Sequence, residues 1–68
     1  RRLEPSRGAT RPVVIEDDVF IGVNCLILKG VTIRRGSVIG AGSVVTGSVP
    51  PHVVAAGNPA RVVRELLV

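Results

Sequence analysis

Branched aliphatic residues return at every sixth position along most of this chain. The series consists of isoleucines and one closing valine: Ile15, Ile21, Ile27, Ile33, Ile39 and Val45. A period of six fits neither the roughly 3.6-residue repeat of an amphipathic helix nor the alternation of a long strand. It suits a short strand followed by a corner, repeated along the chain, and therefore predicts an all-β repeat fold.

The positions between the aliphatic residues predict where the corners lie. Three residues after each isoleucine stands a residue type that tolerates positive φ: Asp18, Asn24, Gly30, Gly36 and Gly42. The next position holds a small or β-branched residue, which suits a cramped, inward-facing site: Val19, Cys25, Val31, Ser37 and Ser43. Each six-residue unit is therefore expected to turn one corner through a residue of left-handed conformation.

The sequence also resembles a known family. Its repeat units, I-G-V-N-C-L, I-L-K-G-V-T and I-G-A-G-S-V among them, resemble those of hexapeptide-repeat acyltransferases. The tail V-P-P-H-V-V-A-A-G-N-P-A-R-V-V-R-E-L is similar to the C-terminal end of galactoside, maltose and xenobiotic O-acetyltransferases. From Pro12 onward, the resemblance implies a left-handed parallel β-helix of about two coils, a homotrimer, and acetyl-CoA as cosubstrate.

The chain divides into three predicted segments. Residues 1–12 hold four arginines and no period, and we expect a mobile basic arm there. Residues 13–51 are expected to form the β-helix, which ends at Pro50 and Pro51 because proline cannot donate to a strand ladder. Residues 52–68 are expected to form a terminal strand, a turn and a capping α-helix.

The predicted helix depends on the sequence G-N-P-A that follows the last strand. Gly57 allows an unusual φ, Asn58 can serve as an N-cap, and Pro59 suits the first helical position. A short α-helix over residues 60–67 would then have an apolar side, formed by Val62, Val63, Leu66 and Leu67. That side would cover the open end of the coil, whose unpaired strand edge otherwise invites aggregation.

The same repeat predicts how the coils stack. If three units close one triangular coil, as the resemblance implies, residues 18 apart stack about 4.8 Å from each other. Glu16 then meets Arg34 and Asp17 meets Arg35, and such exposed pairs are worth about 0 to 1 kcal/mol each. These pairs contribute more by destabilising any arrangement in which the strands of the two coils are out of register.

Outward-facing positions of the coils would form apolar ridges. The stacked pairs are Phe20 with Val38, Leu26 with Val44, and Thr32 with Pro50. Burying several such side chains stabilises an assembly by about 1.5 to 3 kcal/mol each, so the ridges predict association independently of the resemblance. A closed ring that uses two different faces of each subunit is the expected form.

A cofactor-binding corner is predicted where small residues stack. Gly22 falls on Gly40 and Val23 on Ala41, so two successive coils lack a bulky outward side chain and leave their backbone open to a slender ligand. The alternative is that these glycines only relieve crowding. The resemblance implies that the pantetheine arm of acetyl-CoA lies along this corner, between neighbouring subunits.

The resemblance also implies where the nucleotide end of the cofactor is held. Thr46 and Arg64 match positions that bind it in the family, whereas Gly47 stands where many relatives carry lysine. The loss of one charge-assisted contact predicts weaker binding than in a full enzyme, although Arg61 could substitute. Alternatively, the two arginines only form a solvated helix face.

Catalysis is where the chain departs from the family. The resemblance implies a histidine general base that takes the proton of a hydroxyl acceptor, but that histidine lies upstream of the matched region. The single histidine here, His52, follows two prolines and is expected to be a surface turn residue. We therefore assign no catalytic residue, and one histidine is too few for the metal sites of hexapeptide-repeat carbonic anhydrases.

Composition argues against several other partners. The formal charge of +4 arises largely from the first segment, and Phe20 is the only aromatic residue, so the stacking platform of a nucleic-acid-binding protein is missing. No apolar stretch reaches the roughly 20 residues of a membrane span. The single cysteine, Cys25, excludes an internal disulfide, is expected to be inert core, and fits a cytoplasmic protein.

Two functions from different classes remain open. The first is the acetyl-CoA-binding, C-terminal part of an O-acetyltransferase, inactive alone because its base is absent; the second is a non-catalytic, trimeric β-helical scaffold. A third, a minimal enzyme that uses His52, predicts that His52→Ala abolishes CoA release. The chain lacks methionine and begins with arginine, so we expect a fragment, a processed product or a cut product. The resemblance implies that contacts to the acceptor lie mostly outside the matched region.

Overall fold

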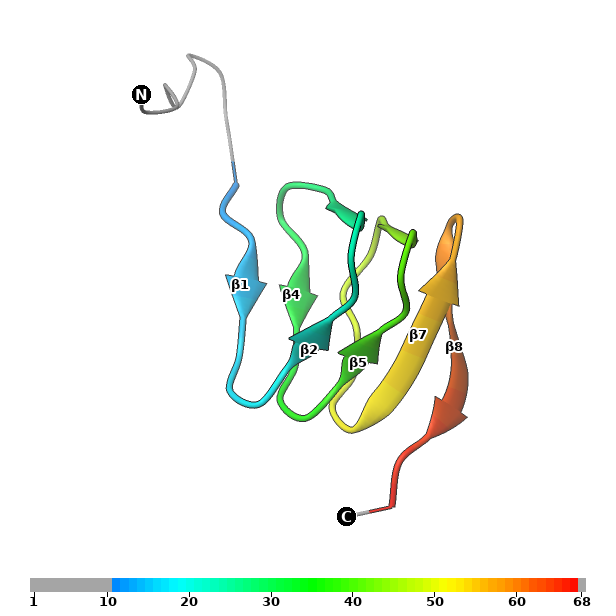
Figure 1. Ribbon diagram of the computed structural model, residues 1–68. Coiled ribbons are helices and arrows are strands. Elements are labelled where there is room, and N and C mark those ends of the chain that lie inside the picture. The colour runs from blue at the N-terminus through cyan, green and yellow to red at the C-terminus, as the bar shows by residue number, and fades with distance from the viewer. Residues whose placement is uncertain (1–10, 68) are drawn as a thin grey trace.

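The computed structural model describes residues 11–67, which form short strands joined by corners (Figure 1). The strands are β1 (Val14–Ile15), β2 (Phe20–Ile21), β3 (Leu26–Ile27), β4 (Thr32–Ile33), β5 (Val38–Ile39), β6 (Val44–Val45), β7 (Val53–Gly57) and β8 (Ala60–Glu65). The basic arm predicted over residues 1–12 lies almost entirely outside the described residues. Within residues 11–67, no helix is long and apolar enough to cross a membrane.

Three sheets hold the stacked coils together, one on each side of a triangle. β1 pairs with β4, β2 with β5, and β3 with β6, all in parallel. Each pair joins residues 18 apart, as Ile15 and Ile33 illustrate. The predicted register is therefore confirmed for the first two coils, including the stacking of Phe20 on Val38.

The corners contain the predicted residues of positive φ. The angle is 61° at Asp18, 58° at Asn24, 80° at Gly30, 72° at Gly36 and 73° at Gly42. We call the three stacked corners A, B and C. Corner A comprises residues 16–18, 34–36 and 50–52, corner B residues 22–24 and 40–42, and corner C residues 28–30 and 46–48.

Charged side chains fix the register at corner A. Arg34 Nη1 lies 3.7 Å from Glu16 Oε2, as the stacking predicts. The other oxygen of the same carboxylate, Oε1, accepts a hydrogen bond from the backbone N–H of Arg35 at 3.0 Å. Glu16 thus contacts both arginines of the next coil, and a shift of the strands by one residue would break both contacts.

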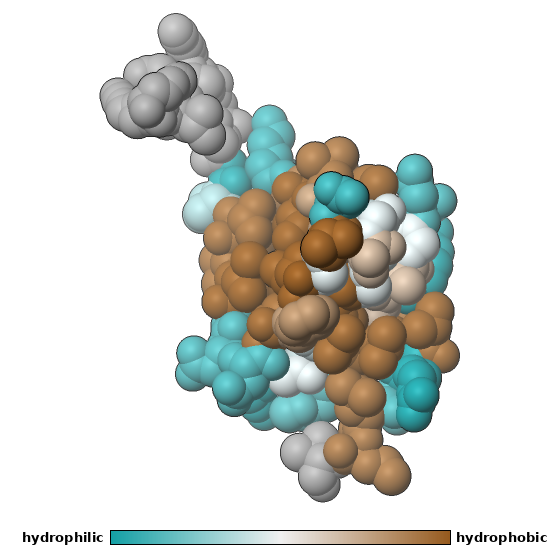
Figure 2. Space-filling model, in the orientation of Figure 1, coloured by the Kyte–Doolittle hydropathy of each residue, from teal (hydrophilic) through white to brown (hydrophobic). Residues whose placement is uncertain are grey.

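The repeat series fills the inside of the coil. Ile33 and Ile39 are fully buried, and Val31, Val45, Val49, Val53 and Ala55 complete the core. Ile15 in β1 is 48% exposed because only β4 pairs with that strand in the described chain. Outward-facing apolar residues also remain exposed, and hydrophobic residues gather across the middle of the face in Figure 2, over β2 and β5.

Two buried serines, Ser37 and Ser43, connect the second coil to β7. Ser37 Oγ accepts a hydrogen bond from Val53 N–H at 3.2 Å. Ser43 Oγ donates to the Gly40 carbonyl at 2.6 Å and accepts from Gly57 N–H at 3.1 Å. The hydroxyls accept from the N–H groups of Val53 and Gly57, and their own hydrogens are also bonded, which is why polar residues are tolerated here.

The third coil is shorter than the repeat predicts. Ile33 bridges to Val49, which lies 16 residues further on instead of 18. The shortening falls between Val45 and Val49, so the last turn of corner C has two residues fewer than the repeat predicts. The predicted stacking of Thr32 on Pro50 is therefore wrong, because the Thr32 carbonyl accepts from Val49 N–H at 2.9 Å.

The predicted C-terminal helix is also wrong. Ala60–Glu65 forms β8, which pairs antiparallel with β7 and extends the second sheet. Gly57, with a φ of 107°, opens the turn that reverses the chain, and the β-branched Val62 and Val63 favour an extended backbone. The free edge of β7 supplies hydrogen-bond partners. Consequently the segment lies along one side of the triangle and does not cap the coil.

Candidate functional site

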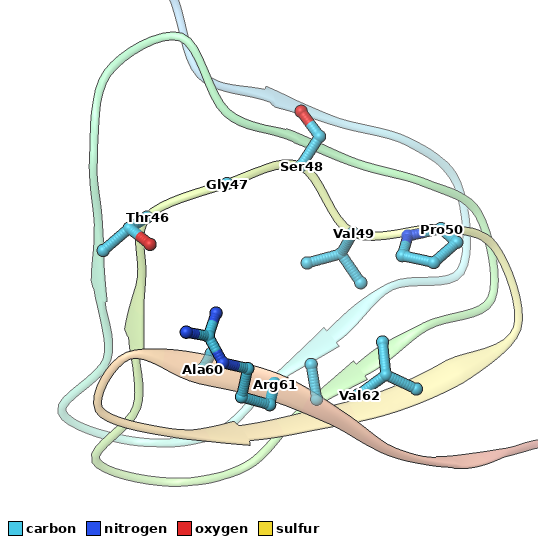
Figure 3. A pocket seen from close by; sticks show the side chains of 9 residues that line it. Thr46, Gly47, Ser48, Val49, Pro50, Ala60, Arg61 and Val62 are labelled. Atoms are coloured by element: carbon cyan, nitrogen blue, oxygen red, sulfur yellow. The ribbon is translucent and has the colours of Figure 1, made fainter.

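A cavity of about 240 Å³ lies where the shortened corner C faces the β7–β8 hairpin. Figure 3 shows the lining side chains in a view through the triangular coil. They come from the segment after β6, from β7 and from β8: Thr46, Gly47, Ser48, Val49, Pro50, Ala55, Ala60, Arg61 and Val62. The cavity thus depends on both features that the repeat did not predict, the short corner and the hairpin.

The lining combines a cation, hydroxyl groups and apolar walls. Thr46 and Ser48 supply hydroxyls, and Arg61 extends its side chain from β8 over the inside of the coil (Figure 3). Val49 and Ala55 supply apolar surface. A guanidinium binds phosphate or carboxylate through charge-assisted hydrogen bonds, so the site suits a ligand with an anionic group and an apolar part. Residues 11–67 contain no cluster of His, Cys, Asp or Glu that could hold a metal ion.

Three of the four residues predicted for the nucleotide end meet at this cavity. Thr46, Gly47 and Arg61 line it, whereas Arg64 pairs with Val54 in the β7–β8 ladder and is not among the lining residues. A Cβ added to Gly47 would meet no atom within 4 Å. Gly47 is therefore an open position in the lining, with space for a larger side chain.

Sequence reasoning missed the apolar walls of the cavity. The sequence predicts Pro50 at the end of the repeat and on an outward ridge, Ala55 in a last strand, and Val62 on a capping helix. One signal was available, because Val49 follows Val45 by four residues and is buried, whereas the repeat spacing is six. That spacing indicates a shortened coil, although it does not indicate which segment closes the gap.

Corner B shows why Gly22 and Gly40 lack side chains. A Cβ on Gly22 would lie 2.7 Å from the backbone nitrogen of Ala41, and one on Gly40 would lie 3.0 Å from Ala56 Cβ. The first distance is too short for any real side chain, so the close approach of successive coils requires Gly22. This supports the crowding explanation. The corner presents to solvent Val23, which is 71% exposed, and Ala41.

Two residues with reactive side chains have structural roles. His52 lies in the last turn of corner A with a φ of 57°, and its N–H donates to the Arg35 carbonyl at 3.0 Å. Its half-buried imidazole packs so closely over Gly36 that a Cβ there would collide with Nδ1. Cys25 Sγ donates to the Gly40 carbonyl at 3.2 Å and packs against the core, as predicted.

The repeat matches a known family of proteins. The family model described as the hexapeptide repeat of succinyl-transferase matches residues 12–47, which is more than half of the chain. The chain belongs to this hexapeptide-repeat family. As a hexapeptide-repeat protein with parallel sheets and left-handed corner residues, it has the predicted left-handed parallel β-helix.

Several proteins that are similar to the chain are acetyltransferases. A 2,3,4,5-tetrahydropyridine-2,6-dicarboxylate N-acetyltransferase of Clostridium perfringens is 52% identical over 64 residues, which is 94% of this chain and 26% of that protein. A hexapeptide-repeat acetyltransferase of Vibrio cholerae, solved with acetyl-CoA, has a TM-score of 0.83 and 52% identity over 85% of this chain and 32% of that one. A maltose O-acetyltransferase of Clostridium difficile has a TM-score of 0.84 and 50% identity, over 85% of this chain and 31% of that one.

These hexapeptide-repeat relatives are considerably longer than the chain. The chain spans 26% of the length of the Clostridium perfringens protein and 32% of the Vibrio cholerae one. Their names include both an N-acetyltransferase and an O-acetyltransferase. The shared feature is therefore transfer of an acetyl group, and the acceptor atom differs among relatives.

Proposed function

We propose that the chain is the acetyl-CoA-binding, C-terminal part of a hexapeptide-repeat acetyltransferase. The observation that carries the proposal is 52% identity over 85% of the chain to the Vibrio cholerae enzyme, whose structure contains acetyl-CoA. The cavity supports the proposal, because a guanidinium beside hydroxyls suits the phosphates of a nucleotide. Acetyl transfer itself belongs to the longer relatives, and this chain supplies the part that holds the donor.

The proposal gives separate roles to two regions of the coil. At corner B, the exposed Val23 and Ala41 contact the pantetheine arm, while Gly22 lets the coils approach each other closely. At the cavity, Thr46 and Arg61 bind the nucleotide end. Gly47 supplies no charge, so binding is weaker than in relatives that carry lysine there.

The same proposal makes the chain inactive in acetyl transfer on its own. A general base must come within hydrogen-bond distance of the acceptor proton. The imidazole of His52, the single histidine, packs over Gly36 at corner A, and His52 is not among the residues that line the cavity. The proposed acceptor is a hydroxyl, although the relatives include an N-acetyltransferase. Loss of CoA release in His52→Ala would overturn this assignment.

We further propose that the chain forms a homotrimer in the cytoplasm. Phe20 is 64% exposed and Leu26 55% exposed, and they lie in register with Val38 and Val44 on two different sides of the triangle. Two different apolar faces per subunit suit a closed ring. Burial of the exposed side chains would stabilise the assembly by about 1.5 to 3 kcal/mol each.

The test is calorimetric titration of acetyl-CoA, with 3′-dephospho-acetyl-CoA beside it, into protein that sedimentation shows to be folded and trimeric. We expect saturable binding that weakens without the 3′-phosphate. Arg61→Gln should weaken binding of acetyl-CoA by roughly tenfold and reduce the difference between the two ligands, because one charge-assisted contact is lost. Arg35→Gln, at corner A, is the matched control and should bind normally.

The alternative is a non-catalytic scaffold, in which the coils and apolar ridges serve assembly alone. The exposed apolar residues on two faces favour the scaffold as much as the acetyltransferase part, because association alone explains them without any ligand. A folded trimer that gives no heat with either thioester would establish this alternative and exclude donor binding. Equal affinity for the two thioesters would instead place the nucleotide away from Arg61.

A further inference from the structure

Charged residues are sorted by corner in the described part of the chain. Three of its acidic residues, Glu16, Asp17 and Asp18, lie at corner A. The fourth, Glu65, precedes Leu66, whose N–H donates to the His52 carbonyl of the same corner. Corner B has no charged residue within residues 11–67, and corner C carries a single charge, the cation Lys29, with Arg11 stacked beside it. The fold therefore gives one edge of the coil a purely positive charge.

Arg11 and Lys29 form a short row of cations along the edge of the coil that carries corner C and, further on, the cavity. The Arg11 carbonyl accepts from Gly30 N–H at 3.2 Å, which stacks Arg11 on the turn that contains the exposed Lys29. The Arg11 side chain lies over Gly30, with Nε 3.3 Å from the point that a Cβ there would occupy. Eighteen residues after Lys29 comes Gly47, which lines the cavity together with Arg61. Strands of successive coils lie about 4.8 Å apart, so the backbones at Arg11 and Lys29 are one coil apart.

We propose that Arg11 and Lys29 attract the anionic end of a CoA thioester and speed its entry into the cavity. The inference rests on the proposed function, because it concerns the same cavity and the same ligand. CoA carries a diphosphate and a 3′-phosphate, and a row of like charges beside a site raises the association rate of an oppositely charged ligand. Because both cations are exposed, their effect falls as salt shortens the screening length from about 30 Å at 0.01 M to 8 Å at 0.15 M.

The chain itself offers a matched control. Lys29 and Arg35 occupy the same place in adjacent turns, each followed by a glycine of positive φ and each exposed. Lys29→Gln and Arg35→Gln remove the same charge from the same kind of position, but only the first changes the row of corner C. Comparison of the two variants separates a local effect from the change in net charge.

The experiment measures association and dissociation rates of acetyl-CoA by stopped-flow mixing with a fluorescent CoA thioester as competitor. At about 0.01 M salt, Lys29→Gln should slow association about threefold and Arg11→Gln/Lys29→Gln about tenfold, with dissociation unchanged. Arg35→Gln should change association less than Lys29→Gln. At about 0.5 M salt, all variants should associate at similar rates.

Each other outcome overturns the inference. Equal slowing in Lys29→Gln and Arg35→Gln would assign the effect to net charge, and unchanged association in Arg11→Gln/Lys29→Gln would exclude the row. A faster dissociation with normal association would make these residues direct contacts. Absence of any binding by the unsubstituted chain would overturn the proposed function as well, which distinguishes that failure from the first three.

Discussion

Two glycines of this chain are glycine for opposite reasons. Gly22 has backbone of the next coil 2.7 Å from where its Cβ would lie, whereas Gly47 has no atom within 4 Å of that point. The sequence places both in the repeat but cannot distinguish them, because the distance between coils is a property of the folded chain. At the scale of residues, Gly22 allows the coils to stack closely and Gly47 leaves space in the cavity.

Gly22→Ala should destabilise the fold by about 1 to 3 kcal/mol, because the added methyl forces the backbone of Ala41 to move. Gly47→Ala is the control and should change the free energy of unfolding by less than about 1 kcal/mol. Urea denaturation followed by circular dichroism measures both. Equal effects of the two substitutions would show that the coils do not approach each other as described.

Gly47→Lys should tighten acetyl-CoA binding by roughly tenfold, since an open position in the lining gains a cation near Arg61. Gly47→Gln has a similar length without the charge and should have little effect. Titration calorimetry with both variants checks the prediction. No gain with lysine would mean that the phosphates lie elsewhere than at this cavity.

At the scale of elements, local pattern predicts the coil and fails at the hairpin. The strands β1 to β6 and their corners follow from the six-residue repeat, because each unit carries its own corner residue. The segment G-N-P-A fits a helix start as well as it fits a turn. What decides is the free edge of β7, which β8 pairs with, and a partner supplied by the fold cannot be seen in local sequence.

Ser43 ties this hairpin to the coil, because its hydroxyl accepts from Gly57 N–H and donates to the Gly40 carbonyl. Ser43→Ala should destabilise the protein by about 1 to 3 kcal/mol, because the N–H of Gly57 loses its acceptor. Ser48→Ala removes a hydroxyl that accepts from Thr32 N–H, but this pair is exposed, so water can replace the hydroxyl and the substitution should cost less. Chemical denaturation compares the two variants, and similar losses of stability would contradict the role given to Ser43.

At the scale of the whole molecule, the fold has a buried core in its second and third coils and apolar surface on its sides. Ile33 and Ile39 are 0% exposed, whereas Phe20 is 64% and Leu26 55% exposed. A chain of this size buries a small core, so association would add stability that the core cannot supply alone. Periodicity predicts these ridges because outward positions recur with the same spacing as inward ones.

Phe20→Asp should convert the proposed trimer into monomers at micromolar concentration, because a charge on the ridge cannot be buried in the ring without a partner. Val14→Asp, on the side of the triangle that carries β1 and β4, should leave the trimer intact. Sedimentation velocity measures both variants. A folded monomer before any substitution would contradict the assembly itself.

The two-residue shortening between Val45 and Val49 also explains how a repetitive chain stops. An array of identical coils has no internal signal for its last member, because every rung presents the same edge to the next. Here the final rung lacks two residues at corner C but still pairs in parallel with the coil before it through β7, and β8 then folds back on β7. Termination thus depends on the number of residues at corner C and on the residue type at Gly57, whose positive φ opens the reversing turn. Insertion of two residues after Thr46 should restore the phase and remove the cavity while leaving the earlier strands unchanged.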